Sequence, residues 1–102
     1  MAEPVALDQY LESDQVTAPA APLGFIDLTV ADAYAPSAPG TMTLKLWING
    51  SGKVVHTEIE KSDLPSDYSD AVAAVFSAAS FTPAMVQGLP VNSIRRIETR
   101  YE

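Results

Sequence analysis

A strand-turn-strand pattern between residues 41 and 60 constrains the fold of this chain more than any other feature. Apolar residues occupy every second position of 41–48, which is the period of a strand with one buried face. The sequence Asn-Gly-Ser-Gly follows at 49–52, and Asn-Gly tolerates the positive φ angles that tight hairpin turns require. Residues 53–60 then alternate again. We therefore predict a β-hairpin, with core residues Leu44, Leu46, Ile48, Val55 and Ile59.

Residues 65–79 carry the signals of one amphipathic helix. Ser66 or Asp67 can cap the unpaired N–H groups of its first turn. Pro83 requires the helix to end before it, and Phe81, just after the helix, can enter the core between helix and sheet. An apolar stripe at helical spacing consists of Tyr68, Val72, Val75, Phe76 and Ala79. We assign to the core Val72, Val75, Phe76, Phe81 and Pro83.

Residues 91–101 are rich in β-branched and charged side chains, and they predict a final strand. Its alternation is imperfect, because Val91 and Ile97 share one parity whereas Ile94 has the other. A β-bulge near Arg95 would bring Ile94 onto the side of Ile97. The alternative is an edge strand on which Ile94 is exposed.

The order of these elements defines a fold class. A hairpin, a helix, a Pro-containing loop at 83–90 and a final strand predict an α+β fold with two layers, a three-stranded antiparallel sheet with one helix packed on one face. The other sheet face would carry Trp47, Val54 and His56. We expect residues 40–102 to form this domain, and we find no internal repeat in the sequence.

Residues 1–39 differ from the rest of the chain in charge and composition. They contain six acidic residues, no basic residue, nine alanines and five of the eight prolines, which predicts an acidic, partly extended N-terminal arm. Within it, residues 5–11 can form a short helical turn that is too short to be stable alone, and residues 25–30 alternate like a strand. The arm residues that we expect to cover the open sheet face are Ile26, Leu28 and Val30.

Composition and charge exclude several classes of function. The net charge of −7 disfavours the binding of nucleic acid or of anionic membrane surfaces. The lack of cysteine excludes disulfides, thiolate zinc sites and iron–sulfur clusters. No segment reaches the roughly 18 apolar residues of a membrane span, and residues 1–10 are too acidic for a signal peptide. We therefore expect no nucleic-acid partner and no direct membrane insertion by this chain.

The chain offers few residues for catalysis or metal binding. His56 is the only histidine, and a metal site or a general base normally needs a second positioned partner. Asp63, Asp67 and Asp70 cluster at the helix start, where capping and the helix dipole explain them more simply than a metal site. No serine lies in a nucleophile-elbow pattern, and no glycine loop suits a phosphate. We predict neither an enzyme nor a cofactor or metal site.

The three arginines of the chain, Arg95, Arg96 and Arg100, all lie in the predicted last strand. They can protect an exposed sheet edge, as charges on edge strands commonly do. Alternatively, the strand is a docking edge that accepts an extended peptide by β-augmentation, and the arginines pair with acidic side chains of that peptide. The candidate partner-binding residues are Val91, Ser93, Ile94, Arg95, Arg96, Ile97, Glu98 and Arg100.

Two features outside the last strand bear on such an edge. The six acids of the arm can face the arginines, so that the arm forms an intrinsic lid over the strand. Trp47, on the polar face of its strand, is expected to pack under the arm, and it becomes an anchor for a partner if the arm is mobile. An open edge can also pair with its own copy in a homodimer.

Three motifs occur in the order and spacing of one known family. They are Gly40-Thr-Met-Thr-Leu-Lys-Leu-Trp-Ile48 running into Gly52-Lys53-Val54, then Phe81-Thr82-Pro83-Ala84, then Gly88-Leu89-Pro90-Val91. Residues 40–102 thereby resemble the C-terminal domain of TonB-like energy transducers, within the wider TonB/TolA C-terminal fold. Asn49 and Ser51 depart from the family pattern, in which the turn commonly holds an acidic residue.

This resemblance implies a periplasmic protein-binding domain that does no chemistry itself. In the family, the last strand docks a short N-terminal box of an outer-membrane receptor, and the system couples inner-membrane energy to transport. A membrane anchor encoded upstream of Met1 would favour that role. The alternatives are a stand-alone periplasmic adaptor or homodimerising module of the same fold without energy coupling, and a TolA-like bridge between envelope proteins.

Overall fold

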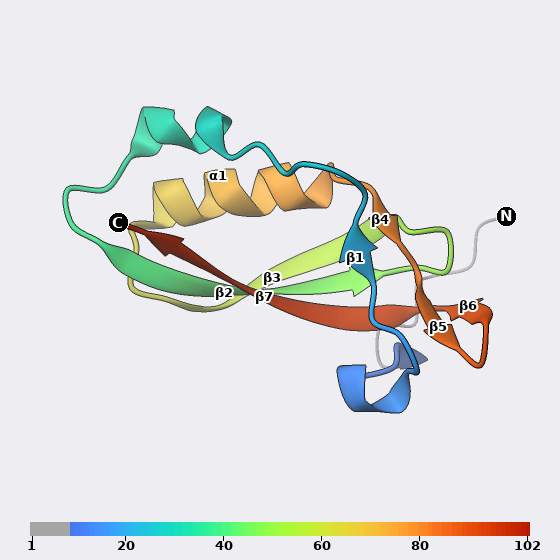
Figure 1. Ribbon diagram of the computed structural model, residues 1–102. Coiled ribbons are helices and arrows are strands. Elements are labelled where there is room, and N and C mark those ends of the chain that lie inside the picture. Colours follow the sequence, from blue (N-terminus) through green and yellow to red (C-terminus); the bar gives the residue numbers. More distant parts are fainter. Residues whose placement is uncertain (1–8) are drawn as a thin grey trace, which may run out of the picture.

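One helix lies against one face of a three-stranded antiparallel sheet (Figure 1). The computed structural model describes residues 9–102. The sheet has the order β3-β2-β7, with β2 at Gly40–Ile48, β3 at Val54–Ser62 and β7 at Ser93–Tyr101. The helix, α1, spans Ser66–Ser77. The predicted α+β class with two layers is confirmed.

Shorter elements connect and flank these layers. Two small antiparallel sheets pair β1 with β4 and β5 with β6. The 3-10 helices η2 and η3 precede β2. The bounds are Ser13–Gln15 for η2, Ala21–Pro22 for β1, Thr29–Tyr34 for η3, Phe81–Thr82 for β4, Ala84–Val86 for β5 and Leu89–Val91 for β6.

The alternation of β2 builds the centre of the core. Every second side chain of this strand is fully buried, and burial of an aliphatic side chain of this size contributes about 1.5–3 kcal/mol. These residues are Met42, Leu44, Leu46 and Ile48. Phe81 joins the same core, as predicted, while Pro83 is half-buried between β4 and β5.

The hairpin is irregular near its turn, and this changes the face of one predicted core residue. A register shift between Trp47 and Ile48 places Val54 opposite Ile48, and Val54 packs on the core. Val55 is 38% exposed, so its assignment to the core is wrong. The extra residue of a β-bulge reverses the parity of the strand at this point. Ile59 packs on the core as predicted.

Gly52 supplies the positive φ angle of the hairpin turn, at 84°, while Asn49 and Gly50 have none. The Gly52 N–H donates to the Asn49 carbonyl at 2.9 Å. The Asn49 side-chain oxygen accepts N–H bonds from Ser51 and Lys53. The expectation that Asn49-Gly50 supplies the positive φ angles of the turn is therefore wrong. In this longer loop the residue with a positive φ angle is the last one, Gly52.

Helix α1 buries most of the stripe that its spacing predicts. Tyr68, Val72 and Phe76 are buried. Val75 is half-buried and lines a surface cavity instead of packing on the core, so its assignment to the core is wrong. Pro65 is the N-cap residue.

Pro65 itself makes no side-chain cap hydrogen bond, but Asp67 Oδ1 accepts the Tyr68 N–H of the first turn at 2.8 Å. The role predicted for Asp67, to satisfy an N–H group at the helix start, is therefore confirmed. The chain is held at this point by Ser62, whose Oγ accepts the Leu64 N–H at 3.0 Å. The same Oγ lies 2.9 Å from Ser69 Oγ. A serine on β3 thus fixes the entry into the helix.

Strand β7 pairs with β2 in continuous register, without a bulge. Ile97 lies opposite Leu44 on the helix side, whereas Ile94 lies opposite Trp47 on the outer face, away from the helix. Ile94 is nevertheless buried, because Tyr10 packs with it and with Trp47. Both alternatives for Ile94, a bulge and an exposed residue, are therefore wrong.

The segment that was expected to be a strand in the arm is a turn followed by η3. Asp27 Oδ1 accepts hydrogen bonds from the Thr29 N–H and from Thr29 Oγ1, and such a local turn competes with a strand. These bonds lower the pKa of the Asp27 carboxyl. Ile26 and Leu28 pack on the helix-side core and Val30 is exposed, so their predicted cover of the other sheet face is wrong.

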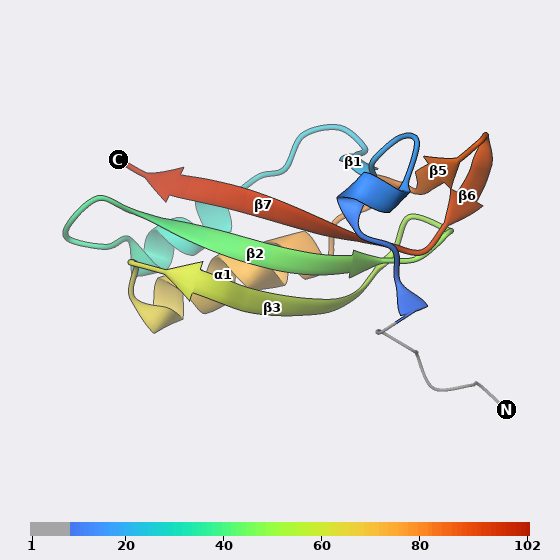
Figure 2. The ribbon, with the colours of Figure 1, turned by 90° about the horizontal axis from the view of Figure 1, so that it is seen from below.

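The arm touches both faces of the domain. Element η2 lies against the outer sheet face near the start of β7 (Figure 2), and η3 lies on α1 (Figure 1). Most of the helical turn predicted for residues 5–11 lies outside the described residues.

The predicted loop at 83–90 contains a small hairpin made of β5 and β6. Its turn has positive φ angles at Gln87, 50°, and at Gly88, 83°, which match the twist of a tight hairpin. Val91 pairs with Ala84 in this hairpin. It therefore belongs to β6 and not to the last strand.

Candidate docking edge

Strand β7 forms one border of the main sheet, on the opposite side from β3. The N–H of Ile94 donates to the Leu11 carbonyl at 2.8 Å, so it points away from β2. The N–H and C=O groups of alternate residues in a strand face the same side. Because the register is continuous, the outward groups are those of Ile94, Arg96, Glu98 and Arg100. We call this row of backbone groups the β7 edge.

Only the start of the β7 edge is paired within residues 9–102. The Leu11 N–H donates to the Asn92 carbonyl at 3.2 Å, and Leu11 and Ser93 form an isolated parallel bridge. No further bridge to this edge occurs among the described residues. Figure 2 shows the C-terminal half of β7 without a strand along its outer side. The open section therefore runs from Arg96 to Arg100.

The predicted binding residues divide between the two faces of β7. Register with β2 places Ile94, Arg96, Glu98 and Arg100 on the outer face. Ser93, Arg95 and Ile97 face the helix side, opposite the buried face of β2. Val91 lies outside β7, so its assignment to the docking edge is wrong.

Arg96 is the most constrained arginine of the strand. Its Nη1 lies 2.6 Å from Glu12 Oε1 in the arm, and its Nε lies 3.1 Å from Glu60 Oε1 on β3. Hydrogen bonds to these two carboxylates raise the pKa of Arg96. The groups are 37–43% exposed, and pairs of this kind contribute about 0.2–1 kcal/mol each. Of the four arm acids within residues 9–102, Glu12 pairs with an arginine, which is one contact of the kind that the lid hypothesis expects.

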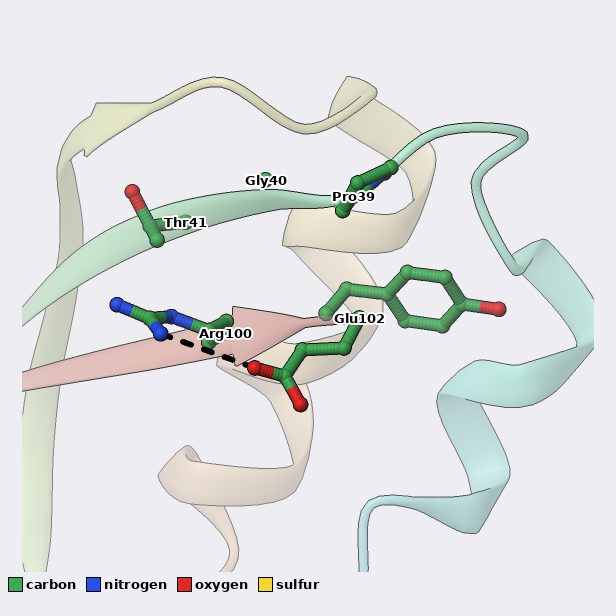
Figure 3. Close-up of a pocket in the computed structure, with 6 residues that line it drawn as sticks. Pro39, Gly40, Thr41, Arg100 and Glu102 are labelled. Atoms are coloured by element: carbon green, nitrogen blue, oxygen red, sulfur yellow. Dashed lines mark ion pairs between the residues drawn. The ribbon is translucent and has the colours of Figure 1, made fainter.

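Arg100 lies beside a shallow pocket at the far end of the β7 edge (Figure 3). The pocket has a volume of about 340 Å³. Arg100 Nη1 is 3.7 Å from Glu102 Oε1, and both side chains are largely exposed. The lining residues are Pro39, Gly40, Thr41, Arg100, Tyr101 and Glu102. An incoming side chain can enter here without displacing any buried group.

Three buried polar atoms on the helix-side face of β7 lack a hydrogen-bond partner among residues 9–102. They are Ser93 Oγ, Arg95 Nε and Thr99 Oγ1. A buried polar group without a partner costs about 1–3 kcal/mol. All three belong to β7, and only Thr99 lies within the open section of the strand.

Residues Tyr10 and Leu11 take part in the site but were missed by sequence reasoning. Tyr10 is buried with Trp47 and Ile94 on the outer face, and burial raises the pKa of its hydroxyl. Leu11 pairs with a segment more than eighty residues away in the sequence. A lone apolar pair in an acidic, Pro-rich arm gives no periodic signal, so only the charge of Glu12 pointed to this contact.

Trp47 packs under the arm, as predicted, and is 6% exposed. His56 lies edge-on to it, with ring centroids 4.9 Å apart, and Lys45 Nζ lies 4.7 Å from the Trp47 ring centroid. His56 is exposed on the strand surface. In residues 9–102 no group of three metal-ligating side chains forms, Asp63, Asp67 and Asp70 included.

The described part of the chain has no helix that is long and apolar enough to cross a membrane. Comparison of the sequence with protein-family models and with curated proteins finds no match.

Proposed function

We propose that this chain is a periplasmic protein-binding domain of the TonB-like type, which docks an extended peptide of an outer-membrane receptor on β7. In this role it couples inner-membrane energy to transport and carries out no chemistry. The proposal rests on the sequence motifs of residues 40–102 and, above all, on the open section of the β7 edge. A strand that adds to a sheet edge gains main-chain hydrogen bonds for affinity and side-chain contacts for specificity.

The side chains along the open section favour an acidic peptide. Arg96 and Arg100 project from the same face of β7, two strand positions on either side of Glu98. The pocket beside Arg100 lies where a peptide paired with the C-terminal half of β7 would end. A carboxylate of the peptide can therefore pair with Arg100, while an apolar side chain enters the pocket.

Calorimetric titration with short peptides from the N-terminal boxes of TonB-dependent receptors tests this proposal. Arg100→Gln should weaken binding about fivefold, the effect of one partly exposed ion pair of about 1 kcal/mol. The matched control is Lys61→Gln on β3 at the opposite border of the sheet, which should leave the affinity unchanged. Equal losses of affinity in Arg100→Gln and Lys61→Gln would indicate a general charge effect. If the peptides do not bind the unaltered protein, receptor docking is refuted.

Self-pairing of β7 is the second candidate function, that of a homodimerising adaptor. In an antiparallel pair centred on Ile97, Arg96 of one copy lies opposite Glu98 of the other. These two residues both present outward N–H and C=O groups, so they can form a hydrogen-bonded pair. Shifting the register by one pair places like charges opposite each other. Glu98→Arg should abolish a dimer of this kind in sedimentation experiments, whereas a chain that stays monomeric at high concentration excludes it.

A further inference from the structure

Three residues of the arm use the same features of β7 that a bound strand would use. Leu11 forms two backbone hydrogen bonds with the edge, at Asn92 and Ile94. Glu12 pairs with Arg96 at 2.6 Å. Tyr10 covers the apolar patch of Trp47 and Ile94.

The contact is short because the chain turns away directly afterwards. Glu12 is the N-cap residue of η2, where its N–H donates to Gln15 Oε1 at 2.8 Å and its carbonyl accepts the Gln15 N–H at 2.9 Å. This reciprocal pair bends the arm away from the β7 edge after a single bridged residue. Few bonds hold the contact, and both carboxylate and guanidinium are partly exposed.

A guest strand that pairs along the whole β7 edge must take over two of these interactions. The guest strand needs a hydrogen bond from the Ile94 N–H, which now donates to the Leu11 carbonyl. It also needs Arg96, which is already paired with Glu12. The two occupants therefore exclude each other at the start of the strand. A tethered segment competes at an effective concentration of about a millimolar, so even a weak contact of this kind reduces the affinity for a free peptide.

We propose that Tyr10, Leu11 and Glu12 form an autoinhibitory latch that occupies the start of the β7 edge until an acidic extended segment displaces it. This inference rests on the proposed function for the identity of the displacing partner, but the latch itself is testable without that partner. Glu12 occupies the place of the acidic side chain that we expect in the partner. The latch also blocks the antiparallel self-pairing described above, because that register needs Ile94.

Amide hydrogen exchange in the full chain tests whether the latch closes. We expect the Ile94 amide to exchange at least about tenfold faster in the double variant Leu11→Pro/Glu12→Gln, because proline removes one donor and disfavours the bridge. Glu12→Gln alone should give a smaller increase. The matched control is Asp14→Asn, which removes one arm charge without any ion pair to lose among residues 9–102. Amides of β2 should stay protected in every variant, which verifies the fold.

A peptide with the sequence of residues 8–13 of this chain then tests competition. It should bind the double variant at least about tenfold more tightly than it binds the unaltered protein or Asp14→Asn. Unchanged Ile94 exchange in the double variant, or equal peptide affinity in all forms, would overturn the latch. Receptor-box peptides that bind neither form, while the 8–13 peptide binds the double variant, would refute the proposed receptor role and leave the latch intact.

Discussion

At the scale of single residues, Gly52 carries the strictest conformational requirement. It adopts a φ of 84°, and a Cβ at this position would collide with the carbonyl oxygen of Phe81. That carbonyl belongs to the residue whose N–H donates to the Gly52 carbonyl at 2.9 Å. The glycine therefore both ends the turn and lets β4 approach the hairpin.

Gly52→Ala should lower the free energy of unfolding by about 2–4 kcal/mol, because backbone strain and a clash with backbone act together. Gly24→Ala is the matched control. Gly24 has a similar φ of 82°, but nothing lies within 4 Å of its added Cβ, so only the conformational cost of about 1 kcal/mol remains. Urea denaturation of both variants measures the difference, and equal losses would show that the approach of Phe81 is not limiting.

At the scale of elements, the register of the hairpin determines which valine supports the core. Val54 and Val55 are neighbours of the same size, and simple alternation assigned the core position to Val55. The bulge beside Ile48 exchanges their faces. A comparison of the two positions therefore tests the register and not merely the presence of a strand.

Val54→Ala should destabilise the protein by about 1 kcal/mol, since it removes apolar contacts from a partly buried position. Val55→Ala should stay within about 0.5 kcal/mol of the unaltered protein. The midpoints of urea unfolding at constant m-value give both numbers. A larger loss for Val55→Ala would place the strand in the regular register and contradict the bulge.

Periodicity predicted the elements that have many repeats of one pattern. The strand around Leu44 and the helix around Val72 each show several turns or pairs of alternation, and both are present. The bulge in the main hairpin and the short hairpin of β5 and β6 were not predicted. A bulge is a single inserted residue, and strands of three residues are too short to show a periodic pattern. The burial of Ile94 was not predicted for another reason, because it depends on Tyr10, which lies in a distant part of the chain.

At the scale of the whole molecule, the arm and the domain together determine which part of the β7 edge is open. The sequence predicted an acidic arm, a last strand with three arginines and a contact between them. It did not predict which acid pairs, nor that the arm reaches both faces of the domain, because both depend on how the chain turns at η2. The β7 edge is consequently divided into a section held by Leu11 and an open section from Arg96 to Arg100.

The central claim is that the open section of the β7 edge accepts an extended peptide as an added strand. The most direct test is amide hydrogen exchange of Arg96, Glu98 and Arg100 with and without a saturating receptor-box peptide. A bound strand should slow exchange of these three amides by about tenfold or more, because outward N–H groups gain partners. Peptide binding that leaves all three exchange rates unchanged would contradict the claim.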